Sequence, residues 1–203
     1  MDWIRDNSSL NRIFFTSKDP PPYCPNSEQL FYLKYECANK PTYSICCSLI
    51  LSCGNFATAN DIIDGTVPII VFCHGIGSNI RTCSLFAQSL ALTSHCHVLL
   101  FDYPGYGLSL SPHHTNESCA CLSIEIILDH LQNQMNVPSN NIVLCGHSLG
   151  TAIATYGMNY LKGCIGGLIL LNPFLSLRKA AEDLTIFGRL ILERLSTQDM
   201  IKI

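Results

Sequence analysis

The sequence has few charged residues and no long apolar run. Asp, Glu, Lys and Arg make up 13% of the 203 residues and the formal net charge is −3, whereas charged residues are about a quarter of an ordinary domain. Such a chain has no basic footprint for nucleic acid, and no run reaches the roughly 18 apolar residues that span a bilayer. A surface so poor in charge is expected to be partly covered, either by a partner or by a further part of the same fold.

The sequence also lacks the signature of a secreted protein. The N-terminus has no basic region followed by an apolar stretch, so no secretory signal is expected. Cys73 and Cys145 end two predicted buried strands, and Cys164 lies beside another. The twelve cysteines are therefore interpreted as reduced core residues rather than a disulfide framework. We expect a cytoplasmic protein. Peripheral contact with a membrane is compatible with this expectation.

One group of potential metal ligands lies in the middle of the chain. His113 and His114 precede Cys119 and Cys121, and two further cysteines are adjacent at 46–47. These spacings match no common zinc pattern, and two residues two positions apart cannot share one face of a helix. We expect neither a metal nor another cofactor.

Apolar patterning predicts one α/β domain. Residues 1–26 contain several prolines and are expected to be an extended N-terminal segment, followed by a single domain at 27–203. Strands are predicted at 29–37, 43–52, 67–73, 97–102, 141–145 and 166–171, and helices at 84–92, 124–135, 149–162 and 180–195. Because strands alternate with helices and are apolar on both faces, a mostly parallel sheet with helices on both faces is expected.

The pattern Gly-x-Ser-x-Gly occurs at 146–150, between the predicted strand 141–145 and a predicted helix. A serine at such a tight strand-to-helix turn is held in a strained conformation with its hydroxyl clear of the sheet. Gly146 and Gly150 remove side chains that would collide with neighbouring backbone. Ser148 is therefore the candidate nucleophile.

A second glycine-rich loop follows the predicted strand 67–73. His74 and Gly75 begin this loop, which can bring its backbone close to a substrate. The candidate oxyanion donors are the backbone N–H groups of Ile76 and of Leu149, at the start of a helix. We expect His74 to support the loop by hydrogen bonding rather than to transfer protons.

A third segment, Phe-Asp-Tyr-Pro-Gly-Tyr-Gly-Leu-Ser at 101–109, resembles the turn after the fourth strand of α/β-hydrolases. Tyr103, Tyr106 and the glycine spacing are most similar to protein depalmitoylases and their serine-aminopeptidase-like relatives. Residues 167–174 resemble the sixth strand and following turn of that group. The resemblance implies an α/β-hydrolase fold and hydrolysis of an ester or thioester through an acyl-enzyme on Ser148. It suggests palmitoyl thioesters of proteins as substrates.

The resemblance is incomplete in its catalytic residues. In that family an aspartate follows the seventh strand and a histidine follows the eighth, but here no histidine follows Ser148. Asp183 lies in a predicted helix and Asp199 precedes the expected seventh strand, so neither matches. The sequence thus predicts a fold truncated before the seventh strand, and it leaves the triad acid and base unidentified.

The other histidines are poor candidates for the general base. His147 adjoins the nucleophile and belongs to the elbow, but the turn is expected to aim its ring away from the serine hydroxyl. His130 lies near the end of a predicted helix, whereas His113 and His114 lie in a loop. None has a position that the pattern assigns to a base, so the base stays open.

Truncation would leave residues 168–171 as an open apolar sheet edge, which invites pairing with a second copy or another chain. Two alternatives follow. Either the sequence is part of a longer hydrolase, which we favour, or it is a catalytically inactive binding or scaffold protein with a hydrolase fold.

Overall fold

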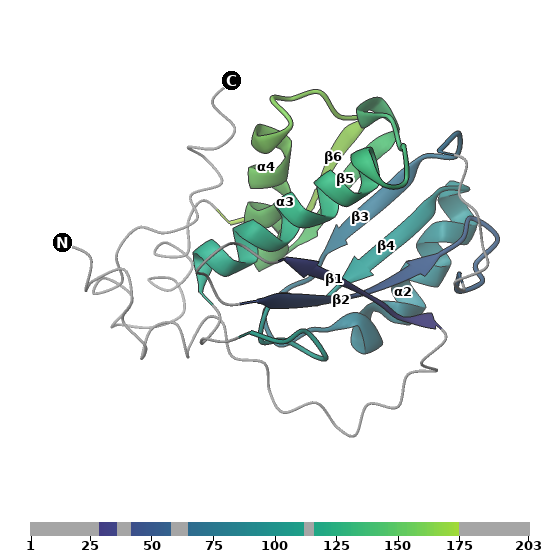
Figure 1. Ribbon diagram of the computed structural model, residues 1–203. Helices are drawn as coiled ribbons and strands as arrows, with labels where there is room; N and C mark the ends of the chain where they lie inside the picture. The colour runs from purple at the N-terminus through teal and green to yellow at the C-terminus, as the bar shows by residue number, and fades with distance from the viewer. Residues whose placement is uncertain (1–28, 36–41, 58–64, 112–115, 175–203) are drawn as a thin grey trace.

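The computed structural model describes residues 29–35, 42–57, 65–111 and 116–174, which form an α/β fold (Figure 1). The strands are β1 (Phe31–Tyr35), β2 (Tyr43–Ile50), β3 (Ile69–Cys73), β4 (His97–Phe101), β5 (Ile142–His147) and β6 (Gly167–Leu171). The helices are α2 (Ile80–Ser94), α3 (Glu117–Asn133) and α4 (Leu149–Tyr160), with a short 3-10 helix η2 (Ser139–Asn141) before β5.

The strands form one sheet in the order β1-β2-β4-β3-β5-β6. β4, β3, β5 and β6 are parallel, whereas β1 and β2 pair in antiparallel fashion at one side. The expected mostly parallel sheet is confirmed. The carboxyl ends of β3, β4 and β5 therefore meet at the same edge of the sheet, and the three segments with sequence motifs follow these three ends.

Helices cover both faces of this sheet, as expected. α2 packs on one face, and α3 and α4 pack together on the other (Figure 1). β3 shows how the sequence achieves this, because all of its residues are buried: Ile69 and Val71 contribute to the core beneath α3 and α4, and Ile70 and Phe72 to the core beneath α2. Burial of each such side chain stabilises the fold by roughly 1.5–3 kcal/mol.

Two helices begin earlier than the apolar pattern predicts, because polar caps set their first residues. The predicted helix 84–92 is α2, which begins at Ile80 after a capping box. Asn79 Oδ1 accepts a hydrogen bond from the Thr82 N–H at 3.0 Å, and the Asn79 N–H donates to Thr82 Oγ1 at 2.9 Å. α3 likewise begins at Glu117, where Asn116 caps the helix.

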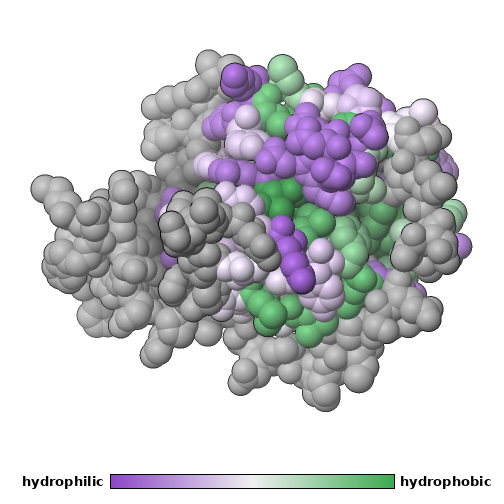
Figure 2. Space-filling model, in the orientation of Figure 1, coloured by the Kyte–Doolittle hydropathy of each residue, from purple (hydrophilic) through white to green (hydrophobic). Residues whose placement is uncertain are grey.

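The surface over α3 and α4 mixes hydrophilic and apolar patches (Figure 2). Two tyrosines of α4 bind carboxylates of α3 across this face: the Tyr160 hydroxyl donates to Asp129 at 3.0 Å, and the Tyr156 hydroxyl donates to Glu125. Within the described ranges, no helix combines the length and the hydropathy that crossing a bilayer requires.

β6 is the last strand of the sheet in the described part of the chain. It pairs with β5 on one side, no described strand lies on its other side, and Ile169 is 41% exposed. That another chain or a second copy covers this edge stays a prediction. The predicted segment 1–26, the predicted helix 180–195, Asp183 and Asp199 lie outside the described residues.

Candidate active site

Ser148 lies at the tight turn between β5 and α4 in a strained backbone conformation. Its φ is 51° and its ψ is −118°, which a residue with a Cβ atom rarely adopts. Two glycines permit the turn. A Cβ atom on Gly146 would overlap the backbone of Gly150, and a Cβ atom on Gly150 would overlap the carbonyl oxygen of Cys73. The Ser148 N–H donates to the Leu171 carbonyl at 3.0 Å, which fixes the turn to β6.

The Ser148 hydroxyl takes no part in capping α4. Thr151 instead satisfies the turn, because its N–H and its hydroxyl both donate to the Ser148 carbonyl oxygen, at 2.9 and 2.6 Å. The Ser148 side chain is half-buried. The turn thus holds a serine hydroxyl at the surface of the site without using it structurally.

The loop after β3 lies directly against this turn. A Cβ atom placed on Gly75 would be 3.3 Å from Ser148 Cβ and 3.0 Å from His147 Nδ1, so a larger residue would push the two segments apart. The loop forms a turn over residues 75–78. The Ser78 N–H donates to the Gly75 carbonyl at 3.2 Å, and Gly77 has a φ of +72°. This geometry is typical of a type II turn.

The two candidate oxyanion donors lie on these neighbouring segments. Leu149 is the first residue of α4, and Ile76 follows Gly75 in the loop. Among the described residues, no acceptor receives a hydrogen bond from the N–H of Leu149 or of Ile76. Unpaired donors at a helix start favour a developing negative charge, so the arrangement is chemically suited to an oxyanion.

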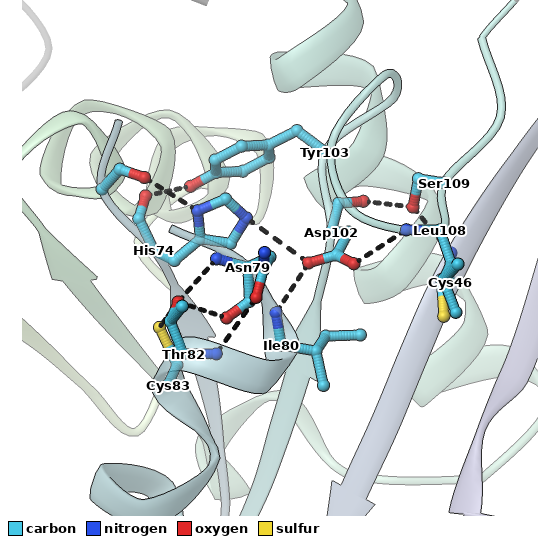
Figure 3. Close-up of polar contacts among 11 residues, drawn as sticks. Cys46, His74, Asn79, Ile80, Thr82, Cys83, Asp102, Tyr103, Leu108 and Ser109 are labelled. Atoms are coloured by element: carbon cyan, nitrogen blue, oxygen red, sulfur yellow. Dashed lines mark hydrogen bonds and ion pairs between the residues drawn. The ribbon is translucent and has the colours of Figure 1, made fainter. Parts of the chain in front are cut away.

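His74 is buried beneath the loop (Figure 3). Its Nδ1 donates to the Gly75 carbonyl at 2.9 Å, and its own carbonyl accepts from the Tyr103 hydroxyl at 2.8 Å. The rings of Tyr103 and Tyr106 pack beside the imidazole, with centroids 4.3 and 5.4 Å away. Burial lowers the pKa of His74 to about 4, so the ring is neutral at pH 7.

Asp102, directly after β4, ties three segments together (Figure 3). Oδ1 accepts from the Ile80 N–H at 2.8 Å, and Oδ2 accepts from the Leu108 N–H at 3.3 Å. The Ser109 hydroxyl donates to the Asp102 carbonyl at 2.7 Å and accepts from the Cys46 N–H at 2.8 Å. Burial raises the pKa of Asp102 to about 6, although its bonds to Ile80 and Leu108 oppose that shift.

The family resemblance of residues 101–109 predicts no role for Asp102. The sequence feature that could have indicated a role for Asp102 is the glycine at position 107. Gly107 has a φ of +48°, and a Cβ atom there would overlap the Asp102 carboxylate. An aspartate followed at a fixed spacing by glycine and then by Ser109 indicates a carboxylate wrapped by its own turn.

No histidine of the described part of the chain forms a hydrogen bond with the Ser148 hydroxyl. His147 is half-buried, and its ring lies against Gly75. His130 packs beside Phe31 of β1, at the side of the sheet opposite β6. His113 and His114 fall in 112–115, which the structure does not describe. The general base therefore stays unassigned.

The cysteines in the group of potential metal ligands lie in the core. Cys46 and Cys47 are buried in β2, and Cys119 and Cys121 in α3. In the ranges that the structure describes, no three His, Cys, Asp or Glu side chains gather as a metal site would require.

Comparison with known proteins gives the family. The profile of the alpha/beta hydrolase family matches residues 70–200. A protein of Acanthamoeba polyphaga mimivirus, provisionally named an alpha/beta hydrolase, is 32% identical over 114 residues, which is 56% of this chain and 43% of that protein. The uncharacterized membrane protein YNL320W of Saccharomyces cerevisiae is 30% identical over 120 residues, 57% of this chain and 40% of its own length.

This chain therefore spans less than half the length of each of these relatives. Among solved structures, an alpha-beta hydrolase of Vibrio vulnificus superposes with a TM-score of 0.69 and 16% identity, covering 96% of this chain and 70% of that one. Since the family profile covers more than half of the sequence and the fold agrees, the chain belongs to the alpha/beta hydrolase family.

Proposed function

We propose that this chain carries the nucleophile and oxyanion site of a serine hydrolase that cleaves an ester or thioester. The observation that supports the proposal is the strained turn at Ser148, which presents beside the Gly75 loop a hydroxyl that takes no part in capping α4. Strain of this kind costs about 1–3 kcal/mol and is stored mainly at functional sites. A purely structural turn would not need it.

In the proposed reaction, Ser148 Oγ attacks the carbonyl carbon of the substrate. The carbonyl oxygen becomes an oxyanion and accepts hydrogen bonds from the N–H groups of Ile76 and Leu149. The intermediate then collapses, the alcohol or thiol leaves with a proton, and water hydrolyses the acyl-Ser148 ester. The hydroxyl proton must pass to a general base. We propose that this base lies outside the described residues, in the part of the longer relatives that this chain does not span.

The finer proposal is that the substrate is a palmitoyl thioester of a protein. It is supported by the likeness of the turn around Tyr103 and Tyr106 to that of protein depalmitoylases. Acylated proteins reside at membranes, and one relative, the yeast protein, is named a membrane protein. We therefore propose that the activity acts at the cytoplasmic surface of a membrane, which the chain would contact peripherally.

A fluorophosphonate probe tests the nucleophile, because it reacts covalently with activated serines. The chain extended to the length of its relatives, which would include the proposed base, should be labelled, and the same extended protein with Ser148→Ala should not. Ser89→Ala is the matched control, since Ser89 is exposed on α2 and should label like the parent. Equal labelling of parent and Ser148→Ala would refute the assignment.

The acyl group is tested next, in the parent protein and in a version extended to the length of the relatives. Turnover of an S-palmitoyl peptide is compared with that of the same peptide S-acetylated. Preference for the palmitoyl form supports the finer proposal. Turnover of the S-acetyl form alone would indicate a thioesterase for short acyl groups and would contradict the depalmitoylase proposal.

A further inference from the structure

One buried nitrogen beneath the loop has no hydrogen-bond partner among the residues that the structure describes. The Gly75 carbonyl oxygen can only accept, so His74 Nδ1 must carry a hydrogen to make their 2.9 Å contact. A neutral imidazole has a single N–H, which leaves His74 Nε2 with a lone pair. Nε2 is buried, and no described atom forms a hydrogen bond with it.

The nearest charged group is a second acceptor. Asp102 Oδ1 lies 3.8 Å from His74 Nε2 (Figure 3), which is too long for a hydrogen bond. With the ring neutral and the carboxylate ionised, two buried acceptors face each other across this gap. Leaving a buried acceptor unpaired is unfavourable, and so is facing it with a negative charge. One proton between the two atoms relieves both costs.

We infer that His74 Nε2 and Asp102 Oδ1 form a buried pair that holds one proton, and that this pair positions the loop between them. When the pair is protonated, the hydrogen is on the Asp102 carboxyl group, and the two side chains move together by about 1 Å from their 3.8 Å separation so that it is donated to Nε2. When it is deprotonated, the proton leaves to solvent, and the carboxylate keeps its bonds from Ile80 and Leu108.

Burial explains why the proton belongs to the aspartic acid. It disfavours the charged form of each group, and so it lowers the pKa of His74 to about 4 and raises the pKa of Asp102 to about 6. Between these two values the carboxyl group is protonated and the imidazole is neutral. In an unfolded chain the order is reversed, because His then titrates near 6.5 and Asp near 3.9.

The other titratable groups around the pair stay neutral in this range. Burial raises the pKa of Cys46 to about 12, and it also raises the pKa of every other thiol and phenol that faces the pair. These groups come from β1, β2, α2, the end of β3 and the turn after β4: Tyr32, Cys46, Cys47, Cys83, Cys73, Tyr103 and Tyr106. None of them gains or loses a charge between pH 4 and 7.

The His74–Asp102 pair contacts the loop after β3 at both of its ends. His74 Nδ1 binds the Gly75 carbonyl at the start of the loop, and Asp102 Oδ1 binds the Ile80 N–H where α2 begins. The exposed Ile76 lies between these two anchors. His74 and Asp102 are thus positioning residues. An effect of these two residues on catalysis depends on the proposed function. The inference that they share a proton does not depend on it.

The sharp test is the pH dependence of stability, measured by urea unfolding of the full chain from pH 4 to 7. Folding moves the proton from the histidine to the aspartic acid without changing the number bound, so this pair gives the parent a flat profile between pH 4 and 6. His74→Asn places an amide donor where Nδ1 binds Gly75 and removes Nε2. Its folding constant should fall about tenfold per pH unit from 4 towards 6, since only the raised Asp102 pKa remains.

Asp102→Asn should show the opposite slope. Only the lowered pKa of His74 then remains, so the folding constant should rise by up to about tenfold per pH unit from 4 towards 6.5. Tyr103→Phe is the control. It removes the hydroxyl that binds the His74 carbonyl but no group that titrates in this range, so its profile should be parallel to that of the parent. Parallel profiles for all four proteins would overturn the proposal.

Nitrogen-15 NMR of the parent needs no variant, so it decides the matter even where a substitution prevents folding. The Nδ1–H tautomer of His74 is expected throughout, with the Nε2 resonance shifting as a hydrogen bond forms below about pH 6. An Nε2–H tautomer at pH 7 would exclude the pair. A parent protein that shows the expected tautomer, and variants that show the expected pH slopes, would support the pair. If the extended form of that parent protein were not labelled by the fluorophosphonate, only the proposed function would be contradicted.

Discussion

Gly150, in the first turn of α4, lies so close to the carbonyl oxygen of Cys73 at the end of β3 that a Cβ atom there would overlap it. The contact joins the helix behind Ser148 to the strand that leads into the His74–Gly75 loop. The candidate nucleophile and the loop are therefore held in register by backbone contact, not by side chains that can adapt.

Gly150→Ala should lower the free energy of unfolding by about 1–3 kcal/mol or more, because the added methyl meets backbone that cannot move aside. Urea unfolding of both proteins measures the difference. Gly167→Ala is the matched control: a Cβ atom there would meet only Val143 methyl groups at 3.8 and 4.0 Å. It should change stability by no more than about 0.5 kcal/mol. Equal losses for the two variants would contradict the account.

The strain at Ser148 makes a prediction of the opposite sign. Glycine accepts a φ of 51° without the steric penalty, so Ser148→Gly should raise the free energy of unfolding by about 1–2 kcal/mol relative to Ser148→Ala. Neither variant should label with a fluorophosphonate. Thermal and urea unfolding compare the two proteins directly, and an alanine variant as stable as the glycine variant would show that the turn stores no strain.

Much of the fold could be predicted from sequence because it depends on apolar pattern. All six strands in the described ranges were expected, since runs such as Ile69–Cys73 are buried on both faces. The starts of α2 and α3 were not expected, because Asn79 and Asn116 set them through hydrogen bonds that leave no apolar period. Periodicity locates the middle of a helix better than its ends.

The candidate site also contains residues that a local sequence pattern predicts and residues that only the tertiary structure identifies. The Gly-x-Ser-x-Gly pattern located Ser148 because its steric reason is local in sequence. The contacts of Asp102 with Ile80 and with His74 Nε2 join residues from three separate segments. No spacing within one segment encodes such contacts, so only the assembled sheet reveals them.

Ser109 should be costly to remove, because it satisfies two buried backbone groups at once. In Ser109→Ala the Cys46 N–H loses its acceptor and the Asp102 carbonyl loses its donor. We expect a loss of about 1–3 kcal/mol in urea unfolding. Ser84→Ala is the control, since the Ser84 hydroxyl donates to the Arg81 carbonyl at an exposed position of α2. Its loss should stay within about 0.5 kcal/mol, and a Ser109 variant as mild as this would show that water replaces both bonds.

Thiol chemistry gives a last check on the core. Cys53 and Cys164 are exposed, whereas Cys46 and Cys73 are buried. Burial raises the pKa of Cys46 to about 12, and it also raises the pKa of Cys73 well above its usual range. At pH 8 roughly one Cys46 thiol in ten thousand is ionised, and only the thiolate reacts with iodoacetamide. Peptide mapping of the native protein should therefore find Cys53 and Cys164 modified before Cys46 and Cys73. The two core thiols should react only at the rate of unfolding, and all four should react alike in urea. Rapid modification of Cys46 or Cys73 without denaturant would mean that β2 or β3 opens to solvent, and the sheet that carries Ser148 would then be less rigid than its contacts require.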